Sequence, residues 1–363
     1  MTSSVIFATG GTGGHIYPAL ALAKIGRNRG ENIIFLGQHG GMEETVTRNA
    51  GFRFIGVPAG KWDLHKPNPL QAISVIRGTL SAVKAARQER PGLIMGFGGF
   101  ASFPGCAAAI LLNIPLVLHD GNVFPGKVTR WFAKRAWAVI GAQRESTTHL
   151  TRAKRFIHIP EPIREKRISK NEAREQLGFP HSGILTLIMG GSQGSETLNR
   201  LVPEAYKQLR RNTSVLHITG PHLQHRPHKS TCSIYKTVPY ADAPLAWSAA
   251  DLGITRSGVS TLAEAAFHGV PLIMLPLPGS ANNHQLLNAQ AVEKAQAGLV
   301  IEAENASILA YKWDKALDPT TLRKASAAAR SRSPAGASER IWKVIDTARH
   351  YTSRTIPKRR ATT

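Results

Sequence analysis

The sequence predicts an α/β protein with two doubly wound parallel sheets, one in each half of the chain. Short apolar segments alternate with helical ones through most of the 363 residues, which is the pattern of parallel βαβ units. Each half opens with an apolar strand that runs into a glycine-rich loop and then a helix. Prolines and charges interrupt the alternation in "IHIPEPIREKR", residues 157–167, which we interpret as a linker between two domains.

The first half shows this alternation in regular order. A buried strand in "SVIFAT" leads into the glycine loop, and a helix follows from about Pro18. "NPLQAISVIRGTLSAVKAARQ" is typical of a long helix, and "CAAAILLNIPLVLH" of a buried helix followed by a strand. The remaining strands are expected in "NIIFLG", "FRFIGVP", "GLIMGF" and "AWAVIG".

The second half repeats the scheme. A strand in "ILTLIMGG" precedes the loop "GSQGS" and a helix in "ETLNRLVPEAYKQLRR". Further strands are expected in "SVLHITG", "DLGITRSG", "VPLIMLP" and "AGLVIE". Ligands of such sheets bind at the carboxyl ends of the strands, so two facing domains predict a cleft between them. We expect domains at residues 1–160 and 161–340, with a helix and a basic tail at 341–363.

The bulk composition limits the class of protein. Hydrophobic residues make up 42% of the chain, as in ordinary globular proteins, and the formal charge is +23. That charge predicts anionic partners, although a solvated basic surface is an alternative explanation. The two cysteines, Cys106 and Cys232, are expected to stay reduced in a cytosolic compartment. We expect neither a signal peptide nor a membrane-spanning segment.

The first glycine loop, in "ATGGTGGHIYPALALA", has the chemistry of an anion site. A nucleotide P-loop would place a lysine where His15 stands, and a dinucleotide fingerprint would need glycine at Ile16. Glycines still allow backbone N–H groups to approach an anion, and the following helix adds its positive end. A tight strand-to-helix turn is the alternative interpretation.

The second half carries three more polar segments. The loop "GGSQGS" at 190–195 is a second glycine-rich connection from a strand to a helix. Arg256 and Ser257 stand at a strand end. Glu264 follows on a helix, where a carboxylate can accept two ribose hydroxyls or simply face solvent. Gln285 and Asn288 lie three apart and share a helix face, where amides suit sugar hydroxyls.

Together, these segments resemble a known enzyme family. In correct order over about residues 5–300, "GGTGGHIYPALALA", "GFGGFASFP", "GGSQGS" with "LN", and "TRSG…E…HQLLNA" are similar to the glycosyltransferases with the GT-B fold. Among these, the chain resembles the MurG family, which transfers N-acetylglucosamine (GlcNAc) from UDP-GlcNAc to lipid I and forms lipid II. The resemblance implies two facing Rossmann-like domains, an N-terminal domain for the acceptor and a C-terminal domain for the donor.

The resemblance also implies roles for individual residues on the donor side. Glu264 would hold the ribose hydroxyls, the glycine loop and Arg256 the diphosphate, and Gln285 and Asn122 the GlcNAc hydroxyls. Uracil would lie against the backbone near Tyr240. The full donor set comprises Thr12, Gly13, Gly14, Asn122, Arg164, Gly191, Ser192, Gln193, Tyr240, Ala241, Arg256, Ser257, Glu264, Gln285 and Asn288.

On the acceptor side, the first glycine loop would face the lipid I diphosphate. The expected contacts are Gly10, Gly11, Gly13, Gly14, Gly98 and Gly99. For the base that takes the acceptor hydroxyl proton we propose His15, because an unperturbed imidazole titrates near neutral pH. His119 and Asp120 are the rival bases. Helix N-termini and backbone donors can stabilise the leaving diphosphate, so no metal and no cofactor are expected.

Three positions depart from the family pattern. The family usually reads "HEQN" where this chain has "HDGN" at 119–122, and "NPVR" where it has "EPIR" at 161–164. The acidic residues that usually precede "HQ" are Asn282 and Asn283. The first departure changes the pocket wall expected near the sugar, and the second places Glu161 where an amide is usual.

The long helix at 69–89 is the expected membrane contact. Leu70, Ile73, Ile76 and Leu80 recur at helical spacing, and Arg77 and Lys84 can meet lipid phosphates. An ordinary amphipathic helix on its own sheet is the alternative. The expected partners are UDP-GlcNAc, lipid I, an anionic membrane surface and cell-wall synthesis proteins, with no nucleic acid, at the cytoplasmic face of the inner membrane.

Two other functions stay open at this point. A different GT-B enzyme, which moves a UDP-linked sugar to a membrane lipid such as diacylglycerol, would share the donor site. A non-catalytic basic binding protein is the second alternative, although aromatic residues are only 7% of the chain and we find no nucleic-acid motif.

Overall fold

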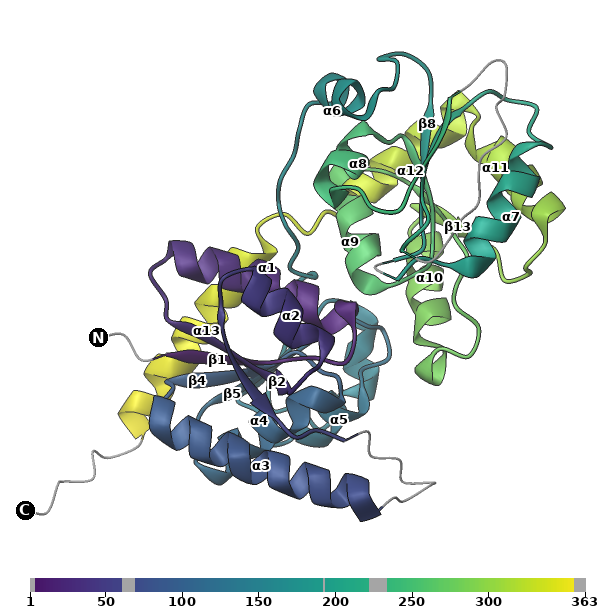
Figure 1. Cartoon of the computed structure of the whole chain (residues 1–363). Helices are drawn as coiled ribbons and strands as arrows, with labels where there is room; N and C mark the ends of the chain where they lie inside the picture. The colour runs from purple at the N-terminus through teal and green to yellow at the C-terminus, as the bar shows by residue number, and fades with distance from the viewer. Residues whose placement is uncertain (1–3, 61–68, 192, 222–233, 356–363) are drawn as a thin grey trace, which may run out of the picture. The chain divides into compact units, whose positions relative to one another are not determined.

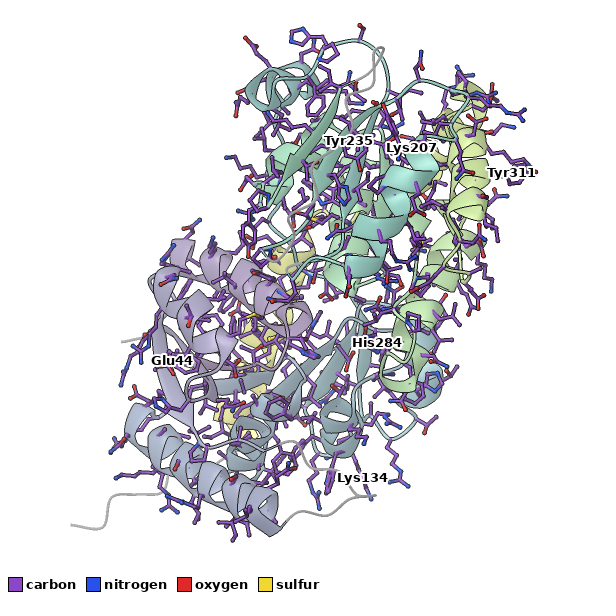
Figure 2. All side chains as sticks on the ribbon, turned by 45° about the vertical axis from the view of Figure 1, so that its right-hand side comes forward. Glu44, Lys134, Lys207, Tyr235, His284 and Tyr311 are labelled. Carbon is purple, nitrogen blue, oxygen red and sulfur yellow. The ribbon has the colours of Figure 1, made fainter. Side chains whose placement is uncertain are left out.

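The chain forms two compact units in a computed structural model that describes residues 4–60, 69–191, 193–221 and 234–355. Residues 1–163 and 336–363 make up unit 1, and residues 164–335 make up unit 2. Basic side chains are spread over the outside of both units, among them Lys134 on unit 1 and Lys207 on unit 2 (Figure 2). Because residues 336–363 belong to unit 1, the end of the chain returns to the unit that contains the N-terminus.

Unit 1 is built on a parallel sheet of seven strands in the order β3-β2-β1-β4-β5-β6-β7. Its strands are β1 (Val5–Ala8), β2 (Ile33–Gln38), β3 (Arg53–Val57), β4 (Leu93–Gly96), β5 (Leu116–Asp120), β6 (Ala138–Gly141) and β7 (Phe156–His158). The strand order reverses beside β1, which pairs with both β2 and β4. Loops after β1 and β4 therefore lie together at the carboxyl edge, where ligands of such sheets bind.

Helices cover both faces of this sheet, and Figure 1 shows α1 beside α13 and α3 beside α4. The helices are α1 (Gly13–Asn28), α2 (Met42–Asn49), α3 (Pro69–Glu89), α4 (Phe103–Leu111), α5 (Lys127–Phe132) and α13 (Ala337–Thr355), with short 3-10 turns at Phe100–Ser102 and Arg144–His149. Trp342 of α13 is buried against α1, where its indole N–H donates to the Leu22 carbonyl at 3.0 Å. This contact ties the end of the chain to its beginning.

Unit 2 has a parallel sheet of six strands in the order β10-β9-β8-β11-β12-β13. Its strands are β8 (Leu185–Met189), β9 (Ser214–Ile218), β10 (Tyr235–Val238), β11 (Leu252–Thr255), β12 (Leu272–Met274) and β13 (Gly298–Val300). Its helices are α6 (Lys170–Leu177), α7 (Glu196–Tyr206), α8 (Ala243–Ala249), α9 (Val259–His268), α10 (His284–Lys294), α11 (Ala306–Ala316) and α12 (Pro319–Ser331), with a 3-10 turn at Ala281–Asn283. Helices α7 and α11 pack on one face, and α8, α9 and α10 on the other.

The two doubly wound parallel sheets confirm the predicted fold class, and several element boundaries differ from the prediction. The segment interpreted as linker overlaps β7, and the elements not predicted are β10, α2, α5, α6, α8, α11 and α12. Helix α1 begins at Gly13 rather than near Pro18, and the proline lies inside the helix, where it has no N–H to donate to the Gly14 carbonyl. Helix α7 ends at Tyr206, five residues earlier than predicted. Cys106 is buried and not in a disulfide, while Cys232 lies outside the described residues.

Candidate functional site

The two glycine loops of unit 1 meet at the carboxyl edge of its sheet. Gly10 and Gly11 follow β1 with φ values of +144° and +89°, and Gly98 and Gly99 follow β4 with φ values of +79° and +73°. A Cβ built on Gly99 would lie 2.1 Å from the Gly10 carbonyl oxygen. The residues expected to bind the acceptor diphosphate therefore lie together, and their backbones touch where a side chain would not fit.

His15 lies between these loops in the first turn of α1. Its Nδ1 is 3.0 Å from the Thr12 hydroxyl, and its carbonyl accepts from the Thr9 hydroxyl at 2.8 Å. A Cβ built on Gly99 would lie 3.1 Å from the same Nδ1. The imidazole is only partly buried, so it combines a fixed position with access to solvent.

The rival bases sit in different surroundings. His119 is 2% exposed, and its Nε2 is 3.5 Å from Oε2 of the buried Glu161. Burial lowers the pKa of His119 to about 4, so this imidazole is a weak base. Asp120 accepts from the N–H groups of Asn122 at 3.2 Å and Gly126 at 2.9 Å, and from the Asn122 amide at 3.3 Å. Both of its oxygens thus hold the loop that leads into α5.

One acid at this edge, Glu43 in the first turn of α2, was not predicted from the sequence. It is 1% exposed and accepts from the N–H groups of Gly11 and Gln38. The sequence feature that could have identified Glu43 is its position shortly after the second strand and the glycine pair Gly40 and Gly41. An acid in that place is usually sought as a ribose ligand, whereas here it turns inward.

Helix α3 exposes large apolar side chains and turns its small ones to the sheet. Leu70, Ile73, Ile76 and Leu80 are 51–73% exposed, and the buried face consists of alanines such as Ala82 and Ala86. Arg77, Lys84 and Arg87 are exposed on the same helix. Large side chains on the outside exclude the alternative in which they pack on the sheet of their own unit.

Two further exposed apolar side chains on unit 1 were not predicted. Leu111 at the end of α4 is 64% exposed, and Trp131 of α5 is 54% exposed. The Trp131 ring packs edge-on against Phe103 of α4, with ring centroids 5.8 Å apart, and α4 packs against α3. Throughout residues 4–60, 69–191, 193–221 and 234–355, no helix is both long and apolar enough to cross a membrane.

The glycine loop of unit 2 connects β8 to the N-terminus of α7. A Cβ on Gly194 would lie 2.2 Å from the Thr219 carbonyl oxygen, while Gly191 faces open space. The Ser195 hydroxyl caps α7 by accepting from the Leu198 N–H at 3.3 Å. Gln193 belongs to the same loop, and Ser192 lies outside the described residues. The loop thus leaves the first N–H groups of a helix without intrahelical partners, as an anion site requires.

Arg256 lies directly behind this loop. Its Nε donates to the Ser195 hydroxyl at 3.1 Å, and its Nη1 donates to the carbonyls of Leu275 at 3.0 Å and Pro276 at 3.2 Å. Burial lowers its pKa, and Glu304 opposes that effect. The guanidinium therefore joins the loop after β8 to the end of β12 and brings positive charge to the helix N-terminus.

Glu264 of α9 in unit 2 has a carboxyl group whose pKa is clearly raised. Its Oε2 accepts from the Trp247 indole N–H at 3.3 Å. Burial raises its pKa from 4.5 to about 7, although the bond from Trp247 and the charge of Arg164 lower it. Glu264 as a residue is partly exposed, so a hydroxylated ligand can reach it at this helix.

The other predicted donor residues of unit 2 form two clusters. In the first, Asn288 donates to the Ser257 carbonyl at 3.4 Å, and the Ser257 hydroxyl donates to the Gln285 carbonyl at 2.8 Å. Asn288 is 1% exposed and braces the turn, whereas Gln285 is partly exposed.

In the second cluster, Arg164 contacts Asp242 at 3.2 Å, beside the exposed Tyr240 and the partly buried Ala241 after β10. Asp242 also caps α8, because its carboxylate accepts from the Leu245 N–H at 3.2 Å. This contact places the arginine of "EPIR" next to the backbone expected to meet uracil.

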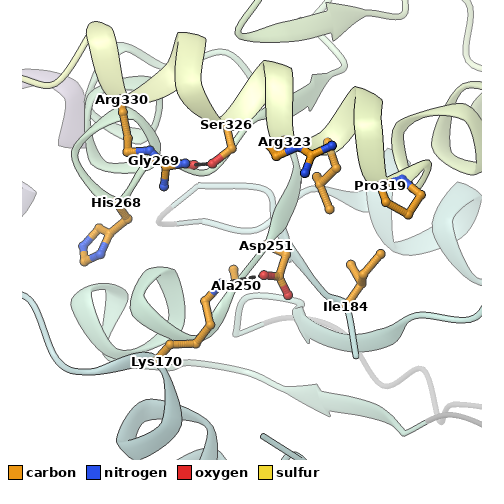
Figure 3. A pocket seen from close by; sticks show the side chains of 11 residues that line it. Lys170, Ile184, Ala250, Asp251, His268, Gly269, Pro319, Arg323, Ser326 and Arg330 are labelled. Atoms are coloured by element: carbon orange, nitrogen blue, oxygen red, sulfur yellow. Dashed lines mark hydrogen bonds and ion pairs between the residues drawn. The ribbon is translucent and has the colours of Figure 1, made fainter. Parts of the chain in front are cut away.

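A separate cavity of about 400 Å³ opens at the opposite end of this sheet (Figure 3). Ile184 and Asp251, which line it, come immediately before β8 and β11. Lys170 pairs with Asp251 at 2.5 Å, and Arg323 and Arg330 of α12 form the other wall. Because the glycine loop follows β8 at its carboxyl end, this cavity is not the predicted donor site.

Comparison with known proteins gives matches along nearly the whole chain. Residues 5–140 match the N-terminal domain of glycosyltransferase family 28, and residues 185–343 match its C-terminal domain. A UDP-N-acetylglucosamine–N-acetylmuramyl-(pentapeptide) pyrophosphoryl-undecaprenol N-acetylglucosamine transferase of Deinococcus deserti is 40% identical, over 95% of this chain and 98% of its own. A protein of the same name from Thermus thermophilus is 38% identical, over 94% and 99%.

Solved structures agree in fold. The MurG structure of Acinetobacter baumannii matches with a TM-score of 0.78 and 24% identity, over 96% of this chain and 100% of its own. A UDP-glucosyltransferase of Polygonum tinctorium matches with a TM-score of 0.71 and 15% identity, over 96% and 99%. These similarities confirm the predicted GT-B architecture.

Proposed function

The chain belongs to glycosyltransferase family 28, among the UDP-N-acetylglucosamine–N-acetylmuramyl-(pentapeptide) pyrophosphoryl-undecaprenol N-acetylglucosamine transferases, and on that premise we propose its reaction and its site. The enzyme transfers GlcNAc from UDP-GlcNAc to the 4-hydroxyl of N-acetylmuramic acid (MurNAc) in lipid I and forms lipid II for peptidoglycan synthesis. The observation that carries this function is the 40% identity to the Deinococcus deserti enzyme along almost the full length of both chains.

The donor binds at the carboxyl edge of the unit 2 sheet. The ionised Glu264 accepts hydrogen bonds from the two ribose hydroxyls. The N-terminus of α7 and the loop at 190–195 bind the diphosphate, and the charge of Arg256 behind the loop favours that anion. Gln285, which is partly exposed on α10, contacts the GlcNAc hydroxyls. What supports this assignment is the partial exposure of Glu264 together with the open space at Gly191.

The acceptor binds at the carboxyl edge of the unit 1 sheet. The N–H groups of Gly13 and Gly14 at the start of α1 hold its pyrophosphate, and Gly98 and Gly99 complete the wall. In the reaction, the MurNAc hydroxyl oxygen forms a bond to the anomeric carbon while the bond from that carbon to UDP breaks, with inversion. His15 takes the hydroxyl proton, which its fixed and accessible imidazole favours over the buried His119 and the engaged Asp120.

The enzyme works peripherally at the cytoplasmic face of the plasma membrane, where lipid I is presented. The exposed apolar side chains of α3 insert among lipid chains, and Arg77 and Lys84 meet lipid phosphates. Each such cation near an anionic surface contributes about 1 kcal/mol, so the formal charge of +23 favours binding. Cell-wall synthesis proteins that act in cell shape and division are the expected neighbours.

One assay separates this function from the alternatives. The purified protein is incubated with UDP-GlcNAc and either a short-chain lipid I analogue or diacylglycerol, and UDP release is followed. Release with the lipid I analogue alone is expected. Release with diacylglycerol alone would identify a different lipid glycosyltransferase. No release with either acceptor, together with salt-sensitive DNA binding, would favour the non-catalytic basic protein.

A further inference from the structure

A buried acid at the edge of unit 1 has no part in the reaction described above. Glu43 lies in the first turn of α2 and is 1% exposed. Its Oε1 accepts from the Gln38 N–H at 2.9 Å, and its Oε2 accepts from the Gly11 N–H at 3.3 Å. One carboxylate therefore joins the glycine loop after β1 to the end of β2.

Glycines approach this carboxylate closely from several sides, at positions where a Cβ would clash with it. A Cβ on Gly10 would lie 2.1 Å from Oε1 of Glu43, and a Cβ on Gly37 would lie 2.8 Å from its Cγ. A Cβ on Gly41 would lie 2.7 Å from Oε2. Glycine thus stands in the loop after β1, within β2 and at the N-cap of α2, at positions where a side chain would clash with Glu43.

The bond to Glu43 decides which N–H groups of the loop are left for a ligand. The Gly11 N–H points inward to the carboxylate, although Gly11 itself is exposed. The first N–H groups of a helix have no intrahelical partner, and in α1 these belong to Gly13 and Gly14. A glycine-rich loop has many accessible backbone conformations, so an anchor at Gly11 selects the one in which these groups face outward.

We propose that Glu43 is the positioning residue of the acceptor site, and that its carboxylate holds the first glycine loop in the conformation that binds the pyrophosphate of the lipid acceptor. This proposal rests on the proposed function, which assigns that loop to the acceptor. Glu43 does not touch the ligand, and its negative charge opposes anion binding, so its contribution is geometric. The same anchor fixes the start of α1, and with it His15.

The neighbouring Glu44 provides a matched control. It lies on the same turn of α2 and also accepts from a loop N–H, that of Gly40 at 2.9 Å. It pairs with Arg48 on its own helix, and none of its described bonds reaches the glycine loop. Figure 2 shows Glu44 at the surface of unit 1.

The test compares Glu43→Gln with Glu44→Gln in the full chain. An amide has a single acceptor oxygen, so Glu43→Gln keeps one of the two bonds and sets an NH₂ group against the other N–H. We expect the KM for a short-chain lipid I analogue to rise at least tenfold. The KM for UDP-GlcNAc should change less than twofold, and Glu44→Gln should change neither constant.

The outcomes distinguish this proposal from the proposed function. Unchanged acceptor KM in Glu43→Gln, or an equal rise in both constants, would refute the positioning role while the proposed function stands. Absence of transfer by the wild type would refute the proposed function and the proposal with it.

A measurement on the wild type keeps the test independent of the folding of the variant. Hydrogen exchange should show the Gly11 amide protected despite its exposed position. Exchange as fast as that of an unbonded loop amide would contradict the anchor directly.

Discussion

The raised pKa of Glu264 gives a prediction in which stability and ligand binding change in opposite directions. Glu264→Gln removes the charge and keeps an oxygen that accepts from the Trp247 indole. The pKa of the folded carboxyl is about 7 against 4.5 without burial, which corresponds to about 3 kcal/mol at roughly 1.4 kcal/mol per pKa unit. Because Glu264 is only partly buried as a residue, solvent screens part of this effect and we expect about 2 kcal/mol.

The sign follows from linkage. A group with a raised pKa contributes its stability below the unfolded pKa, and loses it as the pH rises through the folded pKa. Below about pH 4.5 the wild type and Glu264→Gln should therefore be equally stable. Between that pH and about 7 the wild type should lose stability, so the variant becomes the more stable of the two. Above about pH 7 the difference in the free energy of unfolding between them should stay constant. Denaturant unfolding across this range measures it, with Glu302→Gln, an exposed acid of the same unit, as the control.

UDP binding should show the opposite effect. A hydrogen bond to a charged acceptor contributes about 1.5–3 kcal/mol, so Glu264→Gln should weaken UDP binding by roughly 10- to 100-fold above pH 7. The wild-type affinity should fall below pH 7 as the carboxyl is protonated, while that of the variant stays flat. A stability difference that does not vary with pH, or a variant that binds UDP normally, would refute the reasoning.

Three further predictions concern the other parts of the site. His15→Ala should lower kcat about 10²- to 10⁴-fold with little change in the KM for UDP-GlcNAc; an unchanged turnover number would exclude His15 as the base. Arg256→Lys loses the planar group that bonds Ser195 and two carbonyls at once, so donor KM should rise about tenfold while acceptor KM is unaffected; equal effects on both would argue for general unfolding. Ile73→Ser with Ile76→Ser should abolish sedimentation with anionic liposomes and leave UDP binding intact, since both side chains are exposed; wild-type sedimentation would contradict the membrane role of α3.

The alternation of apolar and helical segments predicted both parallel sheets because it reflects local physics. Buried parallel strands are continuously apolar, and glycine loops mark their carboxyl ends. The periodicity of α3 placed Leu70, Ile73, Ile76 and Leu80 on one side, but only the structure shows that this side faces outward, because alanines are enough to pack on the sheet.

What escaped prediction depends on long-range packing. β7 is a three-residue edge strand whose proline-rich surroundings hide it. Trp342 reads locally as one face of a helix, yet it packs against α1 from the far end of the chain. Glu43 lies at a helix start, where acids commonly stay in solvent, and it has room to turn inward because Gly10, Gly37 and Gly41 carry no side chain.

The chemical structure of the product shows directly whether GlcNAc is transferred to the 4-hydroxyl of MurNAc with inversion. The purified enzyme is supplied with UDP-GlcNAc and a short-chain lipid I analogue, and the isolated product is examined by mass spectrometry and NMR. We predict one added GlcNAc, linked through its anomeric carbon in the β configuration to the 4-oxygen of MurNAc. Release of UDP without a glycosylated acceptor, an α linkage, or a sugar on another hydroxyl would contradict it.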